Sequence, residues 1–203
     1  MSSINEIKNR KAAMRAEAHR RRVAQVDKEA LSRRICERIA TFPEFADARA
    51  VLLYVSYASE VGTPVLIDRA FDEEKTVVVP YCVGNELWLF RLESMADLAP
   101  GTYDILEPRP ALRGLDERRI PAEQLDLIVV PGVAFDARCN RLGHGKGYYD
   151  RLLPYVRPET LLVAPAFECQ IFDAVPTLDH DVPVHRVVTE SRVYPDEGVG
   201  DRG

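Results

Sequence analysis

The stretch LDLIVVPG, residues 125–132, decides the fold, because an apolar run of strand length ends there in a Pro-Gly pair. Apolar runs rich in β-branched residues are typical of strands covered on both faces, as in a parallel sheet. Further strands are predicted at AVLLYVS (50–56), TVVVPYC (76–82), ELWLFRL (86–92), LLVAPAF (161–167) and VHRVVTE (184–190). The chain therefore has enough strands for one central sheet.

Helical segments alternate with these strands. Residues 4–23 contain no Gly or Pro and are rich in Ala, Arg, Lys and Glu, which favours a helix. A second helix is expected from Asp27, as its N-cap, to about Thr41, because Pro43 disfavours its continuation. Shorter helices are expected from Thr63-Pro64 to Phe71, with Thr63 as the N-cap, after Ser94 and over 148–153, and a loop over 99–121.

The alternation indicates a single layered α/β domain with a mainly parallel sheet flanked by helices. The 203 residues, 46% of them hydrophobic, suffice for one core over 1–195, with a disordered tail at 196–203. Ligands of such folds collect at the carboxyl ends of strands. Three polar segments follow strands and are expected to converge on one site: 56–63, 131–150 and 166–170.

Charge and cysteine placement narrow the function classes. Residues 1–40 carry a net charge of +6 and the remainder −11, so a basic helical segment precedes an acidic body. An acidic body without an aromatic-studded basic stretch does not favour nucleic acid. The chain has no run of 18 apolar residues and no apolar secretory core, and its four cysteines form no Cys-x-x-Cys pair. We expect a cytoplasmic protein that binds no nucleic acid and no membrane.

The stretch RLGHGKGYYDR, residues 141–151, has the chemistry of a phosphate site without a familiar phosphate-loop pattern. Gly143, Gly145 and Gly147 are spaced by two, and Lys146 is followed by glycine, so neither the Walker nor the dinucleotide pattern fits. Glycines nevertheless let backbone N–H groups approach an anion, and Lys146 adds positive charge. The alternative interpretation is an ordinary glycine-rich turn with a solvated lysine.

Several separate stretches, in order along most of the chain, resemble the 5-formyltetrahydrofolate cyclo-ligase family. The main one is PGVAFDARCNRLGHGKGYYDRLL at 131–153. The others are Lys11 with Arg15, Ser56 with Glu60, Glu107-Pro108, Ala166-Phe167 with Gln170, and Asp181 ahead of Thr189-Glu190. The resemblance implies a Rossmann-like fold of the NagB/RpiA/CoA-transferase-like kind.

The resemblance also implies an activity. Members convert 5-formyltetrahydrofolate to 5,10-methenyltetrahydrofolate with ATP as co-substrate and Mg²⁺ as cofactor, through a phosphorylated formyl intermediate that yields ADP and phosphate. Phosphoryl transfer depends on positioning and charge neutralisation, so the chemistry needs no Ser-His or Cys-His pair. The partners implied are small molecules only, the reduced formylfolate and ATP. The chain is expected to be a monomer.

Site residues follow from the same resemblance. Catalytic roles are implied for Lys146, Arg141 and Tyr148, and metal binding for Asp150 and Asp181. Nucleotide contacts are implied for Lys11, Arg15, Arg141, Leu142, Gly143, His144, Gly145, Lys146, Gly147, Tyr148 and Tyr149. Folate contacts are implied for Val55, Glu60, His144, Gly145, Lys146, Gly147 and Tyr148.

Three positions depart from the family pattern. Cys139 stands where many members place Gly, so a positive φ there would strain the turn. His144 occupies a variable position, and His185 stands where an acidic residue is common. These departures keep one alternative open, a non-catalytic folate- or nucleotide-binding paralogue with a drifted site. A further alternative is another ATP-dependent ligase or kinase on the same scaffold. A transition-metal site built from Asp179, His180, Asp181 and His185 is a weaker one, because nucleotide and oxygen ligands suit magnesium.

Overall fold

A seven-stranded sheet forms the centre of the molecule in the computed structural model, which describes residues 4–101, 105–179 and 181–195. Its five middle strands pair in parallel, and the two outer pairs are antiparallel. The order is β12 (Val193–Tyr194), β11 (Arg186–Val188), β9 (Leu161–Pro165), β6 (Leu127–Val129), β1 (Ala50–Leu52), β2 (Thr76–Val83) and β3 (Glu86–Leu92). The predicted mainly parallel α/β sheet is confirmed.

The strand order reverses between β1 and β6. From β1 the chain continues to β2 and β3 on one side, then returns to place β6, β9 and β11 on the other. Val51 pairs with Leu127 and Leu52 with Ile128, so the two strands run side by side in the same direction. In open α/β sheets such a switch point leaves a crevice outside the carboxyl ends of the two strands.

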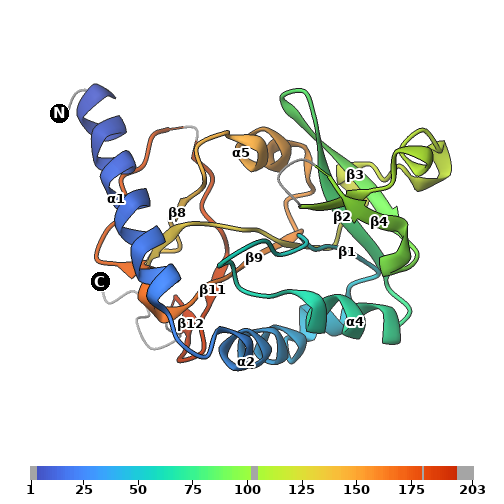
Figure 1. The fold of residues 1–203 in the computed structure, drawn as a ribbon, viewed down its shortest axis with the longest axis horizontal. Helices are drawn as coiled ribbons and strands as arrows, with labels where there is room; N and C mark the ends of the chain where they lie inside the picture. The colour runs from blue at the N-terminus through green and yellow to red at the C-terminus, as the bar shows by residue number, and fades with distance from the viewer. Residues whose placement is uncertain (1–3, 102–104, 180, 196–203) are drawn as a thin grey trace.

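Helices cover both faces of the sheet (Figure 1). On one face lie α2 (Lys28–Ala40), α3 (Pro43–Asp47) and α4 (Pro64–Asp72), whose Ile35, Phe45 and Ile67 are fully buried. On the other lies α5 (Tyr148–Leu152), whose Leu152 packs with the core cluster around Phe135 and Ile128. The sheet therefore has a packed core on each face, as the two-sided burial of its strands requires.

The long first helix docks beside the sheet rather than on it. Helix α1 (Ile4–Ala24) buries Ala18 against Val133, Ala134 and Leu142. Ala134 and Leu142 belong to a small second sheet, made of β10 (Ile171–Phe172), β7 (Ala134–Asp136) and β8 (Arg141–Leu142), and Val133 immediately precedes β7. This packing brings the basic first helix alongside the 141–151 stretch (Figure 1).

Several elements differ from the sequence-based expectation. The loop expected over 99–121 holds a hairpin of β4 (Leu98–Pro100) and β5 (Leu106–Pro108), and Pro43 begins the short α3. Strands of two or three residues, such as β7, β8, β10 and β12, are too short to show a periodic pattern. Short 3₁₀ helices lie at Met95–Asp97, Pro110–Leu112, Asp116–Arg118, Ala122–Gln124, Leu153–Tyr155 and Glu168–Gln170. The predicted disordered tail at 196–203 lies outside the described residues.

Two expected helix caps do not act as caps. Asp27 precedes α2 with φ 53° and makes no side-chain capping bond, so that part of the prediction is wrong. Thr63 precedes α4, but its hydroxyl donates to the Tyr54 carbonyl oxygen at 2.7 Å instead of accepting from the helix. That bond ties the start of α4 back to the end of β1, so the hydroxyl stabilises tertiary structure.

A buried aspartate organises the turn that leads into the 141–151 stretch. The Asp136 carboxylate is 2% exposed and accepts from the N–H groups of Arg138, Asn140 and Val175 and from the Asn140 side chain, at 2.9–3.0 Å. The turn places Cys139 at φ 62°, in the left-handed region that favours glycine. The strain expected at Cys139 is therefore present.

We expect Asp136→Ala to lower the free energy of unfolding by about 3–5 kcal/mol, because four donors lose a buried charged acceptor. Urea unfolding followed by circular dichroism measures the change. Asp68→Ala, on the exposed face of α4, is the matched control and should change stability little. Equal stability of the two variants would contradict the structural role of Asp136.

Candidate functional site

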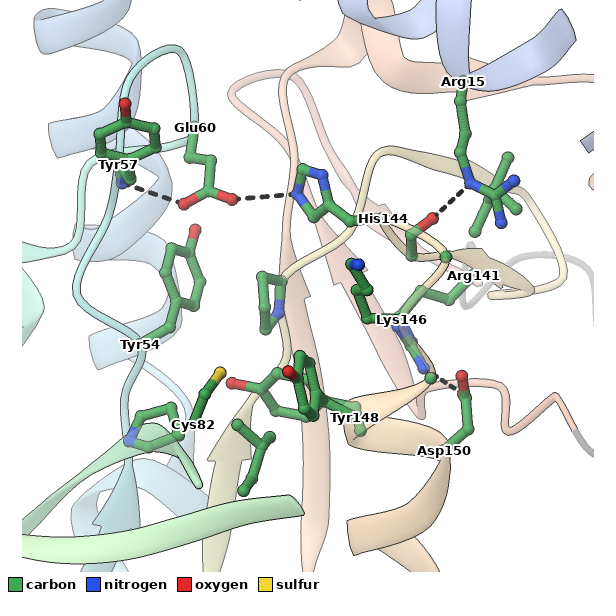
Figure 2. Close-up of a pocket in the computed structure, with 18 of the residues that line it drawn as sticks. Arg15, Tyr54, Tyr57, Glu60, Cys82, Arg141, His144, Lys146, Tyr148 and Asp150 are labelled. Carbon is green, nitrogen blue, oxygen red and sulfur yellow. Dashed lines mark hydrogen bonds and ion pairs between the residues drawn. The ribbon is translucent and has the colours of Figure 1, made fainter. Parts of the chain in front are cut away.

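A cavity of about 990 Å³ opens at the switch point between β1 and β6. Its main walls are one face of α1, the segment after β1, the end of β2 and the 141–151 stretch, and residues 105–107, Pro131 and the segment with Leu178 and Asp181 complete the lining. Figure 2 shows side chains from these parts directed toward one another across the space. The cavity is large enough for a drug-sized or cofactor-sized ligand.

Two of the three segments expected to converge do so. Residues from 55–60 and from 131–151 line the cavity, whereas the 166–170 segment does not line it. Gln170 is 1% exposed, and its Nε2 donates to the carbonyl oxygens of Gly132 and Val133 at 3.2 and 2.9 Å. The expectation for the third segment is therefore wrong, because it supports the Pro-Gly turn from behind.

Glu60 is the carboxylate on the β1 side of the cavity. Its Oε2 accepts from the Tyr57 N–H at 3.0 Å, and its Oε1 lies 3.2 Å from His144 Nε2. The side chain is 15% exposed, so the carboxylate has a defined orientation at the cavity wall (Figure 2). Val55, also expected here, lines the cavity beside it. Each carboxylate oxygen keeps acceptor capacity for N–H groups of a ligand.

The glycine-rich loop faces Glu60 from the other side. Arg15 Nε donates to the Gly143 carbonyl oxygen at 2.8 Å, and a Cβ at Gly145 would lie 3.4 Å from the Arg15 guanidinium. Gly145 has φ 97° and Gly147 has φ 66°, so both use backbone conformations that side chains disfavour. Glycine at these positions lets the loop lie against Arg15.

Lys146 lies at the centre of the labelled side chains in Figure 2, between His144 and Tyr148. The side chain is exposed and lines the cavity. Within the described part of the chain, no hydrogen bond or ion pair engages its ammonium group. It is therefore available to an anionic ligand in the cavity.

Two other basic side chains of the cavity are paired with the aspartates expected to bind metal. Arg141 donates to Asp150, and Lys11 donates to Asp181. Arg141 is 7% exposed and its Nε is buried without a hydrogen-bond partner, which leaves one donor of the guanidinium unsatisfied. Lys11 is also 7% exposed, unusual for an unpaired lysine, and Asp181 compensates its charge.

The aspartates offer hard oxygen ligands but no complete metal cage. Among residues 4–101, 105–179 and 181–195, no cluster of three or more His, Cys, Asp or Glu side chains could hold a metal ion. Magnesium is commonly held by one or two carboxylates together with substrate phosphates and water. Asp150 and Asp181 fit a cation that enters with a phosphate-bearing ligand. His185 accepts from the Leu162 N–H at 2.9 Å, which gives it a structural role, and His180 lies outside the described residues.

The two tyrosines of the 141–151 stretch have different surroundings. Tyr148 donates to the Gly84 carbonyl oxygen at 3.2 Å, and the Arg151 guanidinium lies 5.3 Å from its ring centroid. The hydroxyl of Tyr149 is buried without a hydrogen-bond partner, and burial raises its pKa. Tyr149 therefore keeps its proton and presents an unused donor. Leu142 lines the cavity but is 2% exposed and packs in the small core beneath α1.

Sequence patterns did not single out several residues of the cavity. Arg22 is 4% exposed, and its Nε donates to the Ser59 hydroxyl at 3.0 Å, which joins α1 to the segment after β1. Tyr54, two residues after β1, donates to the Val61 carbonyl oxygen, and burial raises its pKa. Cys82 and Lys8 also line the walls. The continuation of Lys11 and Arg15 to Arg22 along one helix face is a signal that could have revealed Arg22.

Cys139 is not placed for redox chemistry. The residue is 3% exposed, and burial raises the pKa of its thiol to about 11. A buried thiol with a raised pKa carries little thiolate at neutral pH. All four cysteines are free thiols.

The fold and the cavity together define a doubly wound α/β protein with a ligand site at its switch point. The sequence model of the 5-formyltetrahydrofolate cyclo-ligase family matches residues 6–190 of this chain. The chain belongs to this family.

Individual relatives agree with the family match. The Escherichia coli 5-formyltetrahydrofolate cyclo-ligase is 30% identical over 180 residues, which cover 86% of this chain and 96% of the relative. A Schizosaccharomyces pombe protein named "Probable 5-formyltetrahydrofolate cyclo-ligase" is 38% identical over 133 residues, or 63% of this chain and 62% of that relative. The NMR structure of Aquifex aeolicus 5,10-methenyltetrahydrofolate synthetase superposes with a TM-score of 0.78 at 35% identity, covering 95% of this chain and 96% of that one.

We expect Gly145→Ala to lower the free energy of unfolding by about 1–2 kcal/mol, because alanine disfavours φ 97°. Denaturant unfolding measures the loss. Gly114→Ala is the matched control, since a Cβ there meets nothing within 4 Å. A Gly145→Ala variant as stable as the control would show that the loop adopts another conformation.

Proposed function

We propose that the chain converts 5-formyltetrahydrofolate to 5,10-methenyltetrahydrofolate with consumption of ATP, releasing ADP and phosphate. The observation that carries this proposal is one cavity that joins a cationic glycine-rich loop to an oriented carboxylate, Glu60. The loop suits a polyphosphate, and the carboxylate suits the N–H groups of a pterin ring. Membership of the cyclo-ligase family supports the pairing of these two ligands.

The reaction joins two steps on the substrate. The γ-phosphoryl group of ATP passes to the formyl oxygen, and ADP leaves. The neighbouring N10 of the folate then attacks the formyl carbon and loses its proton, and phosphate departs with the former formyl oxygen. The first step turns a poor leaving group into a good one. The protein contributes positioning and charge neutralisation and needs no covalent nucleophile.

On the nucleotide side, the proposal assigns the phosphates to Lys11, Arg15, Arg141 and the loop from Leu142 to Tyr149, in which His144 would contribute its backbone and not its imidazole. Lys146 is the cation proposed for the transferred phosphoryl group, because its ammonium is exposed to the cavity and engaged by no other described group. Arg141 supplies a buried guanidinium with an unsatisfied Nε. Leu142 contributes packing beneath the loop rather than a polar contact.

A magnesium ion is proposed at Asp150 and Asp181, where hard carboxylate oxygens line the same cavity. When bound, it would neutralise charge on the phosphate oxygens. Both carboxylates are paired with basic side chains, Asp150 with Arg141 and Asp181 with Lys11. The two carboxylates thereby keep the basic side chains of Arg141 and Lys11 oriented at the cavity wall.

On the folate side, Val55, Glu60 and Tyr148 are proposed to contact the pterin, with His144, Gly145, Lys146 and Gly147 from the loop. Tyr148 lies against the β2–β3 hairpin through its bond to the Gly84 carbonyl, so its ring has a fixed place at the wall. The half-buried carboxylate of Glu60 can accept two hydrogen bonds from adjacent N–H groups.

The partners proposed are small molecules, and the chain is proposed to act as a cytoplasmic monomer that binds no nucleic acid and no membrane. The four free thiols are consistent with a reducing compartment. None of the helices described is long and apolar enough to cross a membrane.

The direct test incubates the purified chain with 5-formyltetrahydrofolate and Mg-ATP and follows the absorbance of the methenyl product. We expect product to form only when ATP and the divalent cation are both present, with one ADP per product. Binding of the folate without turnover would instead support a non-catalytic paralogue. ATP hydrolysis with another acceptor, and none with formylfolate, would support a different ligase or kinase.

We expect Lys146→Ala to lower kcat by about 10²-fold or more, because a positioned cation on the transferred group acts mainly in the transition state. Steady-state kinetics of methenyl formation measure the change. Arg34→Ala removes an exposed positive charge from α2, away from the cavity, and should leave kcat unchanged. Full activity of Lys146→Ala would remove this residue from the phosphoryl-transfer role.

A further inference from the structure

We infer that His144 is a positioning residue, which holds the Glu60 carboxylate and connects it to the glycine-rich loop that Arg15 contacts. Through this connection, nucleotide binding and folate binding are coupled. This inference rests on the proposed function and assigns a task to the side chain at the centre of the glycine-rich loop. Figure 2 shows the His144 ring directed away from the loop, toward the Glu60 carboxylate.

The contact joins two segments that are far apart in the chain. His144 Nε2 lies 3.2 Å from Glu60 Oε1, across 84 positions of sequence. Among the described residues, no other hydrogen bond or ion pair joins the segment 57–60 to the loop 141–147. The histidine is therefore the direct polar connection between the two sides of the cavity.

The chemistry of the pair fixes the direction of the hydrogen bond. A carboxylate only accepts, so the Nε2 atom of His144 carries the proton and donates it. The other carboxylate oxygen, Oε2, accepts from the Tyr57 N–H at 3.0 Å. Glu60 is thus held through both oxygens, and removal of the imidazole would release one of them while the backbone contact remains.

The backbone of His144 is held on both sides by Arg15. The preceding carbonyl, of Gly143, accepts from Arg15 Nε at 2.8 Å, and the following residue, Gly145, lies against the guanidinium. A ligand that moves Arg15 or the loop therefore moves His144, and through it Glu60. Coupling of this kind travels through contiguous contacts and is reciprocal, so each ligand changes the affinity for the other by the same factor.

The solvent exposure of the His144 side chain argues that it positions Glu60 and does not pack in the core. Its side chain is 53% exposed, whereas that of Glu60 is 15% exposed, so the histidine contributes little to the core. The phosphate role belongs instead to Lys146, whose ammonium no other described group engages. Loss of the imidazole should therefore leave the fold and the nucleotide site intact.

The test measures 5-formyltetrahydrofolate binding by calorimetry, with and without saturating Mg-ADP, for the full chain and for His144→Ala. In the unmodified chain we expect Mg-ADP to tighten folate binding about fivefold or more, the low end of typical coupling between sites. In His144→Ala this factor should fall toward one, while the Kd for Mg-ADP alone stays the same. In turnover, KM for formylfolate should rise about fivefold with a smaller change in kcat.

Two further variants separate positioning from simple loss of a histidine. His144→Gln keeps an N–H donor at the end of the side chain and should restore most of the coupling. Arg34→Ala removes an exposed side chain of α2 outside the cavity and should leave the coupling factor and both KM values unchanged. A double-mutant cycle with Glu60→Gln should be non-additive, since both changes remove the same contact.

The outcomes distinguish this inference from the proposed function. Failure of the unmodified chain to form the methenyl product sinks the proposed function, whatever His144 does. Normal turnover with an unchanged coupling factor in His144→Ala overturns the positioning role alone. A weaker Kd for Mg-ADP alone in that variant overturns it too, because His144 would then be a nucleotide contact.

Discussion

The parallel pairing of β1 with β6 is the constraint on which the rest of the structure depends. Val51 beside Leu127 and Leu52 beside Ile128 align the two carboxyl ends at the same edge of the sheet. The segment with Glu60 and the segment with the glycine-rich loop leave the sheet at this edge and flank one cavity. A register shift between these strands would turn their core side chains over and separate the two halves of the site.

Helix α1 completes the site because one of its faces carries both apolar and basic side chains. Ala18 buries against the small sheet, and this contact brings Lys11, Arg15 and Arg22 to the cavity. Each of these three cations is held by an acceptor from a distant segment: Asp181, the Gly143 carbonyl and the Ser59 hydroxyl. Ordered cations lose less entropy when an anion binds, so the arrangement is preorganised for a polyphosphate.

The backbone of the glycine-rich stretch is shaped by its neighbours as much as by its own glycines. Gly145 and Gly147 adopt positive φ values, and Arg15 and Arg151 occupy the space that side chains there would fill. The upstream turn uses the same left-handed conformation at Cys139, where Asp136 supplies enough hydrogen bonds to hold it. The strained backbone at Cys139 thus lies in the turn that supports the loop and not in the cavity wall.

The sequence by itself determined the α/β class, the long strands and the identity of the loop, because apolar runs and glycine spacing are local properties. It could not show the short strands outside the predicted apolar runs, β4, β5, β7, β8, β10 and β12, which offer too few residues for a periodic pattern. The tertiary structure decided that Gln170 supports the Pro-Gly turn, that Arg22 reaches the cavity, and that His144 meets Glu60. Each of these contacts joins residues at least 37 positions apart, so only the packing of the sheet and α1 could bring them together.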